Sequence, residues 1–164
     1  MTAIRALQVD DLPDVVALSL RAWQPVFASL RRQLGDPIFL RLHPDWKTGQ
    51  ADAVRSTCTS PDRDVFVAVV DDRPVGFVAV ALDAYHPRMR AVDMIAVDPE
   101  YQRRGIAREM MAFAADHMRR SGMDIAVVET GGDPGHAPAR QAYESAGYTL
   151  LPIARYFQLL HEDR

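Results

Sequence analysis

The middle of this sequence contains a short apolar run, residues 95–97, which stops at an Asp98-Pro99 turn and is followed by a loop with two arginines and a glycine. Apolar residues then recur at three- and four-residue spacing over 105–121, which predicts a helix that ends at Gly122. The first N–H groups of a helix have no partner inside the helix, and its dipole adds about half a positive charge there. This order of strand, loop and helix start therefore predicts an anion site within an α/β fold. Its glycine spacing differs from those of the dinucleotide and nucleoside-triphosphate motifs.

The segments on either side of this feature predict a mixed sheet in a single domain over residues 1–164. Strands are expected over 4–7, 65–70, 75–82, 90–97 and 124–129, with two more strand-like segments over 148–151 and 155–160. Helices are expected over 12–23, 105–121 and 139–146, and residues 26–34 and 46–59 are also helical in character, separated by Gly35, Pro37 and Pro44. The turn residues 71–74 make 65–82 a hairpin. The order β-α-α-β-β-β-α-β-α-β-β indicates antiparallel N-terminal strands and one right-handed β-α-β crossover in the middle.

Composition restricts the function classes. The chain has 164 residues, of which 48% are hydrophobic and 25% charged, as is typical of a globular domain. A net charge of −3 argues against nucleic-acid binding through bulk charge. No apolar run approaches the ~20 residues that span a bilayer and no signal peptide is visible, so we expect a cytoplasmic protein without a membrane segment. Cys58 is the only cysteine, and no histidine or carboxylate cluster has metal-ligand spacing, so we expect neither a disulfide nor a metal site.

The loop that follows Asp98-Pro99, together with the start of the predicted helix, has the residue types that an anion site requires. Gly105 allows the backbone to approach phosphate oxygens without an intervening side chain, and Ala107 is small enough for the same purpose. Arg103, Arg104 and Arg108 can add charge-assisted hydrogen bonds. The alternative interpretation is a solvated basic loop at the start of an ordinary helix.

Two motifs carry a resemblance to a known family. Gln102-x-x-Gly105-x-Ala107, preceded by Ile95-Ala96-Val97-Asp98-Pro99, resembles the acetyl-CoA-binding motif of the GCN5-related N-acetyltransferase (GNAT) superfamily. Residues 139–148, in which Tyr143 precedes Gly147-Tyr148, resemble the last motif of that family. The resemblance covers nearly the whole chain and is strongest over 64–148. It implies a GNAT-like mixed sheet with splayed fourth and fifth strands and about four flanking helices.

The resemblance also implies where acetyl-CoA binds. Its pantetheine arm would lie between the strand of residues 95–97 and the strand of residues 126–129, and would pair with exposed backbone groups of Ile95 and Val97. The acetyl carbonyl would lie near the backbone N–H of Ile95 or Ala96, which stabilises the developing oxyanion. The pyrophosphate would lie at residues 103–108. The residues that the resemblance assigns to acetyl-CoA are Ile95, Ala96, Val97, Gln102, Arg103, Arg104, Gly105, Ile106, Ala107 and Arg108.

Candidate catalytic residues follow from the same resemblance. Tyr143 is expected to supply the proton that the departing thiolate needs, since a thiol with a pKa near ~8.5 and a phenol near ~10 are close enough for transfer or strong hydrogen bonding; a tyrosine that merely packs on the sheet is the alternative. Asp93 is the first candidate for the base that deprotonates the amine, because strand alternation places it on the face of Ile95 and Val97. Glu129 is the second candidate, and either carboxylate can instead be the partner of a nearby arginine.

One part of the family pattern is absent. Many members carry an asparagine shortly before the last helix, whereas residues 130–138 contain none, and Asp133 or His136 are the candidates to replace it. A flexible loop with a surface histidine is the alternative. For the acceptor site, Trp23, Phe27, Trp46 and Tyr85 are candidate lining residues and equally candidate core residues.

The function that the resemblance implies is acetyl-CoA-dependent transfer of an acetyl group to a primary amine, expected to be that of a small molecule, by direct attack in a ternary complex. Acetylation of a protein N-terminus or lysine is one alternative, and a non-catalytic module that senses acyl-CoA is another. The expected partners are acetyl-CoA and an amine acceptor, without nucleic acid or membrane, in a monomer or a homodimer.

Overall fold

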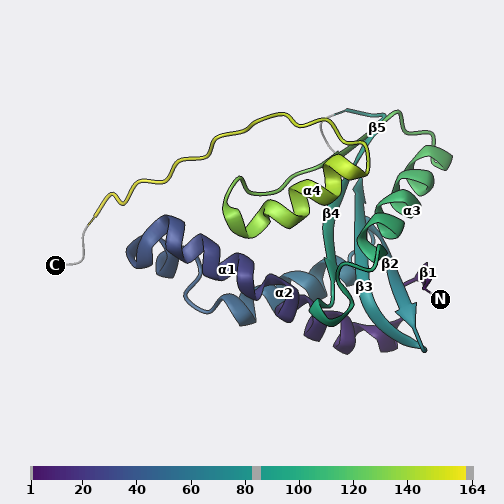
Figure 1. Cartoon of the computed structure of the whole chain (residues 1–164), viewed down its shortest axis with the longest axis horizontal. Coiled ribbons are helices and arrows are strands. Elements are labelled where there is room, and N and C mark those ends of the chain that lie inside the picture. The colour runs from purple at the N-terminus through teal and green to yellow at the C-terminus, as the bar shows by residue number, and fades with distance from the viewer. Residues whose placement is uncertain (1, 83–85, 162–164) are drawn as a thin grey trace.

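The computed structural model describes residues 2–82 and 86–161. Its centre is a five-stranded sheet in the order β1-β2-β3-β4-β5 (Figure 1). The strands are β1 (Ala3–Ala6), β2 (Arg63–Val70), β3 (Arg73–Leu82), β4 (Met89–Val97) and β5 (Ile125–Val128). The pairs β1–β2, β2–β3 and β3–β4 are antiparallel, and the pair β4–β5 is parallel. The predicted mixed sheet with a central β-α-β unit is confirmed.

Four helices flank the sheet, as expected: α1 (Leu12–Leu42), α2 (Trp46–Thr59), α3 (Ile106–Arg120) and α4 (Ala137–Ser145). The face toward α1 and α2 buries one set of alternating strand residues, which includes Val65, Val67, Phe77, Ala79 and Ala96. The opposite face buries another set against α3, which includes Val78, Val80, Val92 and Val97. Short 3₁₀ turns lie at η1 (Val9–Asp11), η2 (Pro99–Tyr101) and η3 (Pro134–His136).

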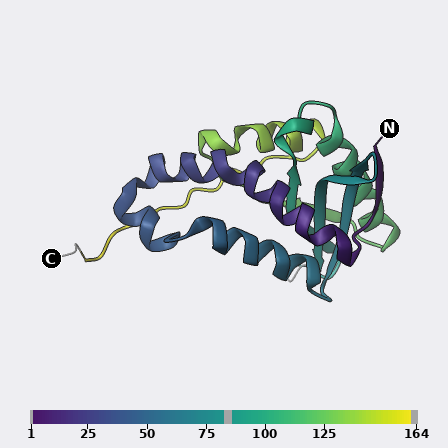
Figure 2. The ribbon, with the colours of Figure 1, turned by 90° about the horizontal axis from the view of Figure 1, so that it is seen from below.

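Helix α1 is longer than predicted. It continues past residue 23 and through Pro25, and its path is broken only at Gly35, where φ is 73° and ψ is 157°. A proline removes one helical hydrogen bond, but Phe27 and Ser29 beyond it are buried, so packing outweighs that loss. The α1–α2 hairpin extends well beyond the sheet (Figure 2).

The predicted hairpin is confirmed, with Asp71 and Asp72 at its tip and positive φ at both. Two residues in the left-handed region match the twist of the flanking strands. The ladder between β3 and β4 is interrupted by a bulge, because Ala79 pairs with Met94 while Val80 pairs with Val92. Asp93 is therefore the unpaired residue of β4.

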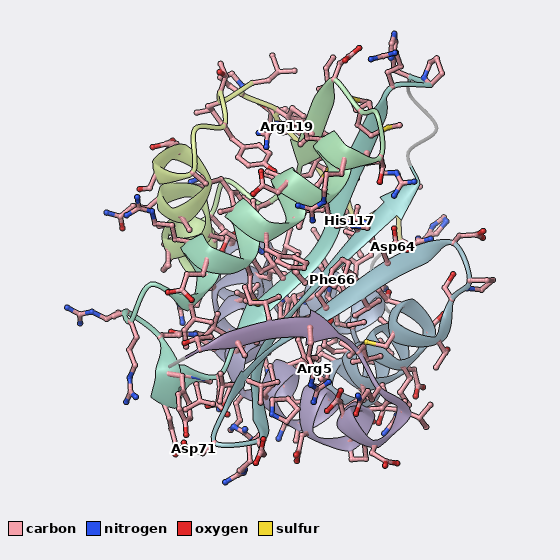
Figure 3. All side chains as sticks on the ribbon, turned by 90° about the vertical axis from the view of Figure 1, so that its right-hand side faces the viewer. Arg5, Asp64, Phe66, Asp71, His117 and Arg119 are labelled. Carbon is pink, nitrogen blue, oxygen red and sulfur yellow. The ribbon has the colours of Figure 1, made fainter. Side chains whose placement is uncertain are left out.

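Helix α3 is held over the sheet at its C-terminal half. His117 of α3 lies over Asp64 and Phe66 of β2 (Figure 3), with 2.8 Å between His117 Nε2 and Asp64 Oδ2. The His117 hydrogen bond is the largest cause that lowers the pKa of Asp64, against the opposing effect of burial. Five apolar side chains of α3 are buried: Ile106, Met110, Met111, Ala114 and Met118. This packing sets where the N-terminus of α3 lies relative to β4.

The two strands expected over 148–151 and 155–160 are not formed. In the described part of the chain these residues carry no helix or strand, and they run as an extended segment away from the sheet (Figure 1). A strand needs a neighbour that satisfies its backbone groups, and these residues have none within the described chain.

Candidate functional site

The sheet opens between β4 and β5. Their pairing covers Met89↔Ile125 to Val92↔Val128 and then stops, so that Asp93 to Val97 have no partner on the β5 side. The Asp98 N–H donates to the Val75 carbonyl at 2.8 Å on the other side. Backbone groups of successive strand residues point to opposite edges, so those of Ile95 and Val97 face the opening and those of Ala96 face β3. The predicted splay of these two strands is confirmed.

The opening leads to the N-terminus of α3. Gly105 is the N-cap residue, with φ of 84°, and it makes no side-chain cap. Arg103 also has a positive φ, of 62°. The first bond of the helix runs from the Glu109 N–H to the Gly105 carbonyl, so the N–H groups of residues 106–108 have no helical partner. Loop and helix start thus present a set of free N–H donors, which favours an anion.

The two arginines of this loop and Arg108, in the first turn of α3, differ in their surroundings. Arg104 lies over the Tyr101 ring at 4.9 Å and donates to the Glu100 carbonyl at 3.0 Å. Arg103 and Arg108 are exposed, and within residues 2–82 and 86–161 they make no hydrogen bond or ion pair. Two guanidinium groups are therefore available to an anion at this helix start.

Two side chains hold the strand end and the loop together. Gln102 Nε2 donates to the Val97 carbonyl at 3.0 Å, which satisfies the oxygen that β5 leaves unpaired. Asp98 is buried, is ion-paired with Arg21 of α1, and accepts from the Glu100 N–H at 3.1 Å. The sequence gives no sign of the supporting role of Arg21, because nothing local to residue 21 reveals a partner 77 positions away.

Tyr143 of α4 packs against the same cluster as Val97 and Ile106, together with Tyr148, whose ring centroid is 6.3 Å away. Burial is the main cause that raises the pKa of Tyr143 to about 12, and Tyr148 adds to it. The phenol therefore stays protonated at neutral pH. Among the described residues its hydroxyl has no hydrogen-bond partner.

Asp93 does not lie where strand alternation predicts it. Because Asp93 is the bulged residue, Val92 shares the α3 side with Ile95 and Val97, and simple alternation no longer applies. The Asp93 carboxylate accepts from Arg63 Nε at 2.7 Å. The alternation that placed Asp93 beside Ile95 is therefore wrong, although its role as a base stays a prediction.

The loop before α4 contains a polar network. Asp133 Oδ2 accepts from Ser29 Oγ of α1 at 2.5 Å, and Asp133 Oδ1 is hydrogen-bonded to His136 Nδ1. Burial acts to raise the pKa of Asp133, but the combined bonds from Ser29, His136 and the Gly135 N–H hold it below its usual range. An aspartate bound to Nδ1 orients the ring so that Nε2 is the free nitrogen. Glu129, the other predicted base, is exposed.

The α1–α2 turn lines an open pocket of about 470 Å³. Phe27 and Trp46 stack at 4.6 Å between ring centroids and line it together with His43, Asp45 and Asp52. Trp23 instead packs toward Phe77 in the core, with 6.4 Å between the ring centroids. Tyr85, the fourth predicted acceptor residue, lies outside the described residues.

Metal-ligating and membrane-spanning features are both absent from residues 2–82 and 86–161. No group of three or more His, Cys, Asp or Glu residues in these two ranges is arranged to hold a metal ion. No helix in them has the length and apolar character to cross a membrane.

Comparisons with known proteins agree with this geometry. Streptothricin acetyltransferase of Streptomyces lavendulae is 32% identical over 126 residues, which cover 76% of this chain and 65% of that protein. The ribosomal-protein-S18-alanine N-acetyltransferase of Escherichia coli is similar in structure, with a TM-score of 0.68, 21% identity, and coverage of 98% of this chain and 86% of that one. PaiA N-acetyltransferase of Thermoplasma acidophilum in complex with coenzyme A has a TM-score of 0.65, 16% identity and 88% coverage of both chains.

The two structural similarities, both under 25% identity, show the shared fold. The matched region spans less than two thirds of the streptothricin enzyme. The family model of the acetyltransferase (GNAT) family matches residues 23–148, a range that holds the opened strand pair, the α3 N-terminus and Tyr143. The chain belongs to the acetyltransferase (GNAT) family.

Proposed function

We propose that this protein is an acetyl-CoA-dependent N-acetyltransferase that acts on a primary amine of a small molecule. The observation that carries the proposal is the opening between β4 and β5, which leads directly to the free N–H groups at the start of α3. A ligand with an extended amide-containing arm and a pyrophosphate satisfies both features at once, and acetyl-CoA has this composition. The CoA complex of PaiA N-acetyltransferase, a protein of the same fold, supports this choice.

Single groups of this site suit single parts of the proposed ligand. The open N–H and carbonyl of Ile95 and the open N–H of Val97 suit the amides of the pantetheine arm, as in the addition of a strand to a sheet edge. The N–H groups of residues 106–108, with Arg103 and Arg108, suit the pyrophosphate. Between the two oxyanion candidates the strand geometry favours the Ile95 N–H, because the Ala96 N–H faces β3.

The proposed reaction is direct attack of the amine nitrogen on the thioester carbonyl. The base takes the proton that the nitrogen loses, the C–S bond breaks, and the departing thiolate is protonated from solvent. Tyr143 remains a neutral donor, since its pKa of about 12 lies well above neutral pH. That value also lies above the ~8.5 of a free thiol, so complete transfer of the phenol proton to the sulfur is uphill. Tyr143 therefore acts as the hydrogen-bond donor that stabilises charge on the sulfur as the C–S bond breaks.

Asp93 is the proposed base for the amine, with His136 as the second candidate. The Asp93 carboxylate accepts from Arg63 Nε at 2.7 Å, whereas His136 is oriented by Asp133 and has a free Nε2. The two candidates are distinguished by the pH dependence of kcat/KM in Asp93→Asn and His136→Gln. Replacement of the true base removes the acidic limb of the profile, and replacement of the other leaves that limb in place.

The pocket at the α1–α2 turn supports a cationic acceptor. Its stacked Phe27 and Trp46 rings offer an apolar wall, and the Asp45 carboxylate adds negative charge, whereas Asp52 is ion-paired with Arg55. The similarity to streptothricin acetyltransferase favours amine-bearing antibiotics among small molecules. The similarity to the S18-alanine enzyme supports a protein N-terminus as the second candidate.

The central test measures acetyl-CoA binding by calorimetry and thiol release with a panel of amines, which includes streptothricin, aminoglycosides and alanine-terminated peptides. We expect binding and turnover with at least one small amine. Turnover with peptides alone would replace the proposed acceptor, binding without any turnover would favour a sensor, and absence of acetyl-CoA binding would refute the proposal.

Gly105→Glu and Gly122→Glu form a matched pair for the anion site. Both glycines have positive φ, of 84° and 80°, both have open space where a Cβ atom would lie, and they lie at opposite ends of α3. The conformational strain is thus similar, but only Gly105→Glu places a carboxylate among the free N–H groups. We expect Gly105→Glu to lose acetyl-CoA binding and Gly122→Glu to retain it; equal affinities would show that the pyrophosphate lies elsewhere.

A further inference from the structure

Helix α4, which carries Tyr143, has little apolar attachment to the rest of the molecule. None of its own residues is buried. Tyr143, near the C-terminal end of α4, packs with Tyr148 in the cluster on the α3 face. The N-terminal end follows η3 directly and lies beside α1 in both views (Figures 1 and 2). The direction of the helix, and with it the position of the Tyr143 hydroxyl, therefore depends on what holds the N-terminal end.

Ser29 of α1 makes a long-range contact at this end. A serine inside a helix commonly bonds to a carbonyl of the preceding turn, and Ser19 of the same helix does so, with 2.8 Å between its Oγ and the Val16 carbonyl oxygen. Ser29 is only 1% exposed, and it instead donates to Asp133 Oδ2 at 2.5 Å and accepts from the Gly135 N–H at 2.9 Å. One buried hydroxyl thus joins α1 to two residues of the loop before α4.

The loop connects this attachment to α4 itself. Arg140, one turn before Tyr143, donates to the Gly131 carbonyl at 2.6 Å and to the Asp133 carbonyl at 2.9 Å. Asp133 Oδ1 is also bonded to His136, the N-cap residue of α4. Both carboxylate oxygens of Asp133 are thus used within the chain, and hydrogen bonds join the loop to the first turns of the helix.

Two glycines of the loop leave the space that this network needs. A Cβ atom at Gly135 would lie 2.5 Å from Ser29 Cβ, and one at Gly131 would lie 2.5 Å from Asp133 Oδ1. Both separations are far below van der Waals contact, so neither position accommodates a side chain while the network is formed. At Gly132, by contrast, a Cβ atom would meet nothing within 4 Å. The loop sequence therefore fits the contact with Ser29 and is not merely that of a flexible loop.

We propose that Ser29 is a positioning residue for the transfer reaction, which holds α4 in the direction that places the Tyr143 hydroxyl at the sulfur of the bound thioester. This inference rests on the proposed function, in which Tyr143 is the hydrogen-bond donor. Without the Ser29 hydroxyl, α4 stays attached through Tyr143 and Tyr148 and pivots about them. A displacement of about 1 Å in a catalytic group can cost about 100-fold in rate. Neither the opening beside β4 nor the α3 N-terminus includes Ser29, so acetyl-CoA binding does not depend on it.

Steady-state kinetics of Ser29→Ala tests this role against Ser19→Ala, which removes the other buried serine hydroxyl of the same helix. We expect Ser29→Ala to lower kcat by about 10-fold or more with an unchanged Kd for acetyl-CoA, and Ser19→Ala to leave kcat unchanged. Gly135→Ala, whose Cβ atom displaces Ser29, should act like Ser29→Ala, and Gly132→Ala should be neutral. A wild-type kcat in Ser29→Ala, or a loss of acetyl-CoA binding, would overturn the proposal.

The effect of Ser29→Ala in the background of Tyr143→Phe separates positioning from a general loss of structure. If Ser29 acts through the Tyr143 hydroxyl, the second substitution should lower kcat no further, since residues that act as a unit are strongly non-additive. Losses of kcat that multiply would show that Ser29 acts on another part of the enzyme, and would contradict the proposal.

Amide hydrogen exchange gives a measurement that needs no turnover. Ser29→Ala should speed the exchange of residues 131–145 and leave that of β4 unchanged, whereas Ser19→Ala should leave both unchanged. Unchanged exchange over 131–145 in Ser29→Ala would overturn the positioning role, whatever the enzyme acetylates. Faster exchange there, in a chain whose wild type acetylates no amine, would support the attachment of α4 through Ser29 and refute the proposed function alone.

Discussion

At the scale of single residues, Tyr143 and Tyr148 show how similar side chains in one cluster differ in chemistry. Both rings pack in the cluster on the α3 face, and burial raises the pKa of each phenol. The Tyr148 hydroxyl is buried without a partner, whereas the Tyr143 hydroxyl is neither bonded nor fully enclosed among the described residues. Only Tyr143 therefore has a donor that a ligand can use.

Tyr143→Phe is expected to lower kcat by about 100-fold or more, since loss of one preorganised hydrogen-bond donor to developing charge typically costs about 10²–10³ in kcat, while the KM for acetyl-CoA changes little. Tyr148→Phe is the control, because removal of an unpartnered buried hydroxyl is neutral or stabilising and leaves kcat nearly unchanged. Steady-state kinetics with any amine that supports turnover measures both. Equal kcat values for Tyr143→Phe and the wild type would remove Tyr143 from the mechanism.

Asp11 offers a residue-scale test of pH dependence. It is buried and accepts from both Arg5 Nη atoms, at 2.6 and 2.9 Å, and from the Gln8 N–H at 2.7 Å. The Arg5 hydrogen bonds are the main cause that lowers the pKa of Asp11. A carboxylate with a lowered folded pKa stabilises the fold above the unfolded value of ~3.9, and this stability is lost as pH falls through the folded pKa.

We expect Asp11→Asn to reduce the free energy of unfolding by about 1–3 kcal/mol at pH 7, and this difference to shrink below about pH 4. Urea unfolding at a series of pH values measures it. Asp10→Asn is the control, because Asp10 is exposed beside Asp11 in the same turn. A difference for Asp11→Asn that does not depend on pH would show that the Arg5 pair is not formed in solution.

At the scale of elements, the path of the long helix α1 depends on one break, at Gly35. Residues before Gly35 pack on the sheet and on η3, and residues after it turn back toward α2. With φ of 73° and ψ of 157°, Gly35 lies in a region that residues with a side chain rarely occupy. A Cβ atom at this position would meet Pro37 Cδ at an ordinary 3.8 Å, so the restriction is conformational and not steric crowding.

Gly35→Ala should therefore destabilise the fold by about 1–3 kcal/mol. Gly49→Ala is the matched control, because Gly49 lies inside α2 with open space around it and an ordinary backbone conformation. There alanine should stabilise the fold by about 0.5–1 kcal/mol through its better helix propensity. The midpoints of urea unfolding give both values. A neutral Gly35→Ala would mean that α1 does not break at this residue.

At the scale of the whole molecule, the opened strand pair and the α3 N-terminus bind different parts of one ligand in the proposed function. If both sites act together, coenzyme A without the acetyl group should stabilise the fold nearly as much as acetyl-CoA, since both carry the pantetheine arm and the pyrophosphate. At a ligand concentration of 100 times Kd, the free energy of unfolding rises by about 2.7 kcal/mol, which corresponds to a rise in Tm of about 5–10 °C. Acetyl-pantetheine, which lacks the pyrophosphate, should give a much smaller rise at the same concentration. Equal rises for acetyl-pantetheine and acetyl-CoA would exclude the α3 N-terminus from the site.

The sequence by itself determined the elements whose signals are local. The hairpin tip at Asp71-Asp72, the start of α3 at Gly105 and its end at Gly122 follow from backbone conformations that few residues adopt, so they were readable from residue type. The family motifs around residues 95–107 and Tyr143 are also local signals, because each is one continuous stretch of sequence.

Only the tertiary structure decided the features that depend on distant partners. The bulge at Asp93 depends on how β4 pairs with β3. The ion pair of Arg21 with Asp98 joins residues that are far apart in the sequence. The stacking of Phe27 on Trp46 needs α1 to continue through Pro25. The segments over 148–151 and 155–160 have strand composition but no neighbour among the described residues, because a strand forms only where another strand satisfies its backbone. Local chemistry thus defined the elements, and long-range contacts decided how they pair and which side chains reach the site.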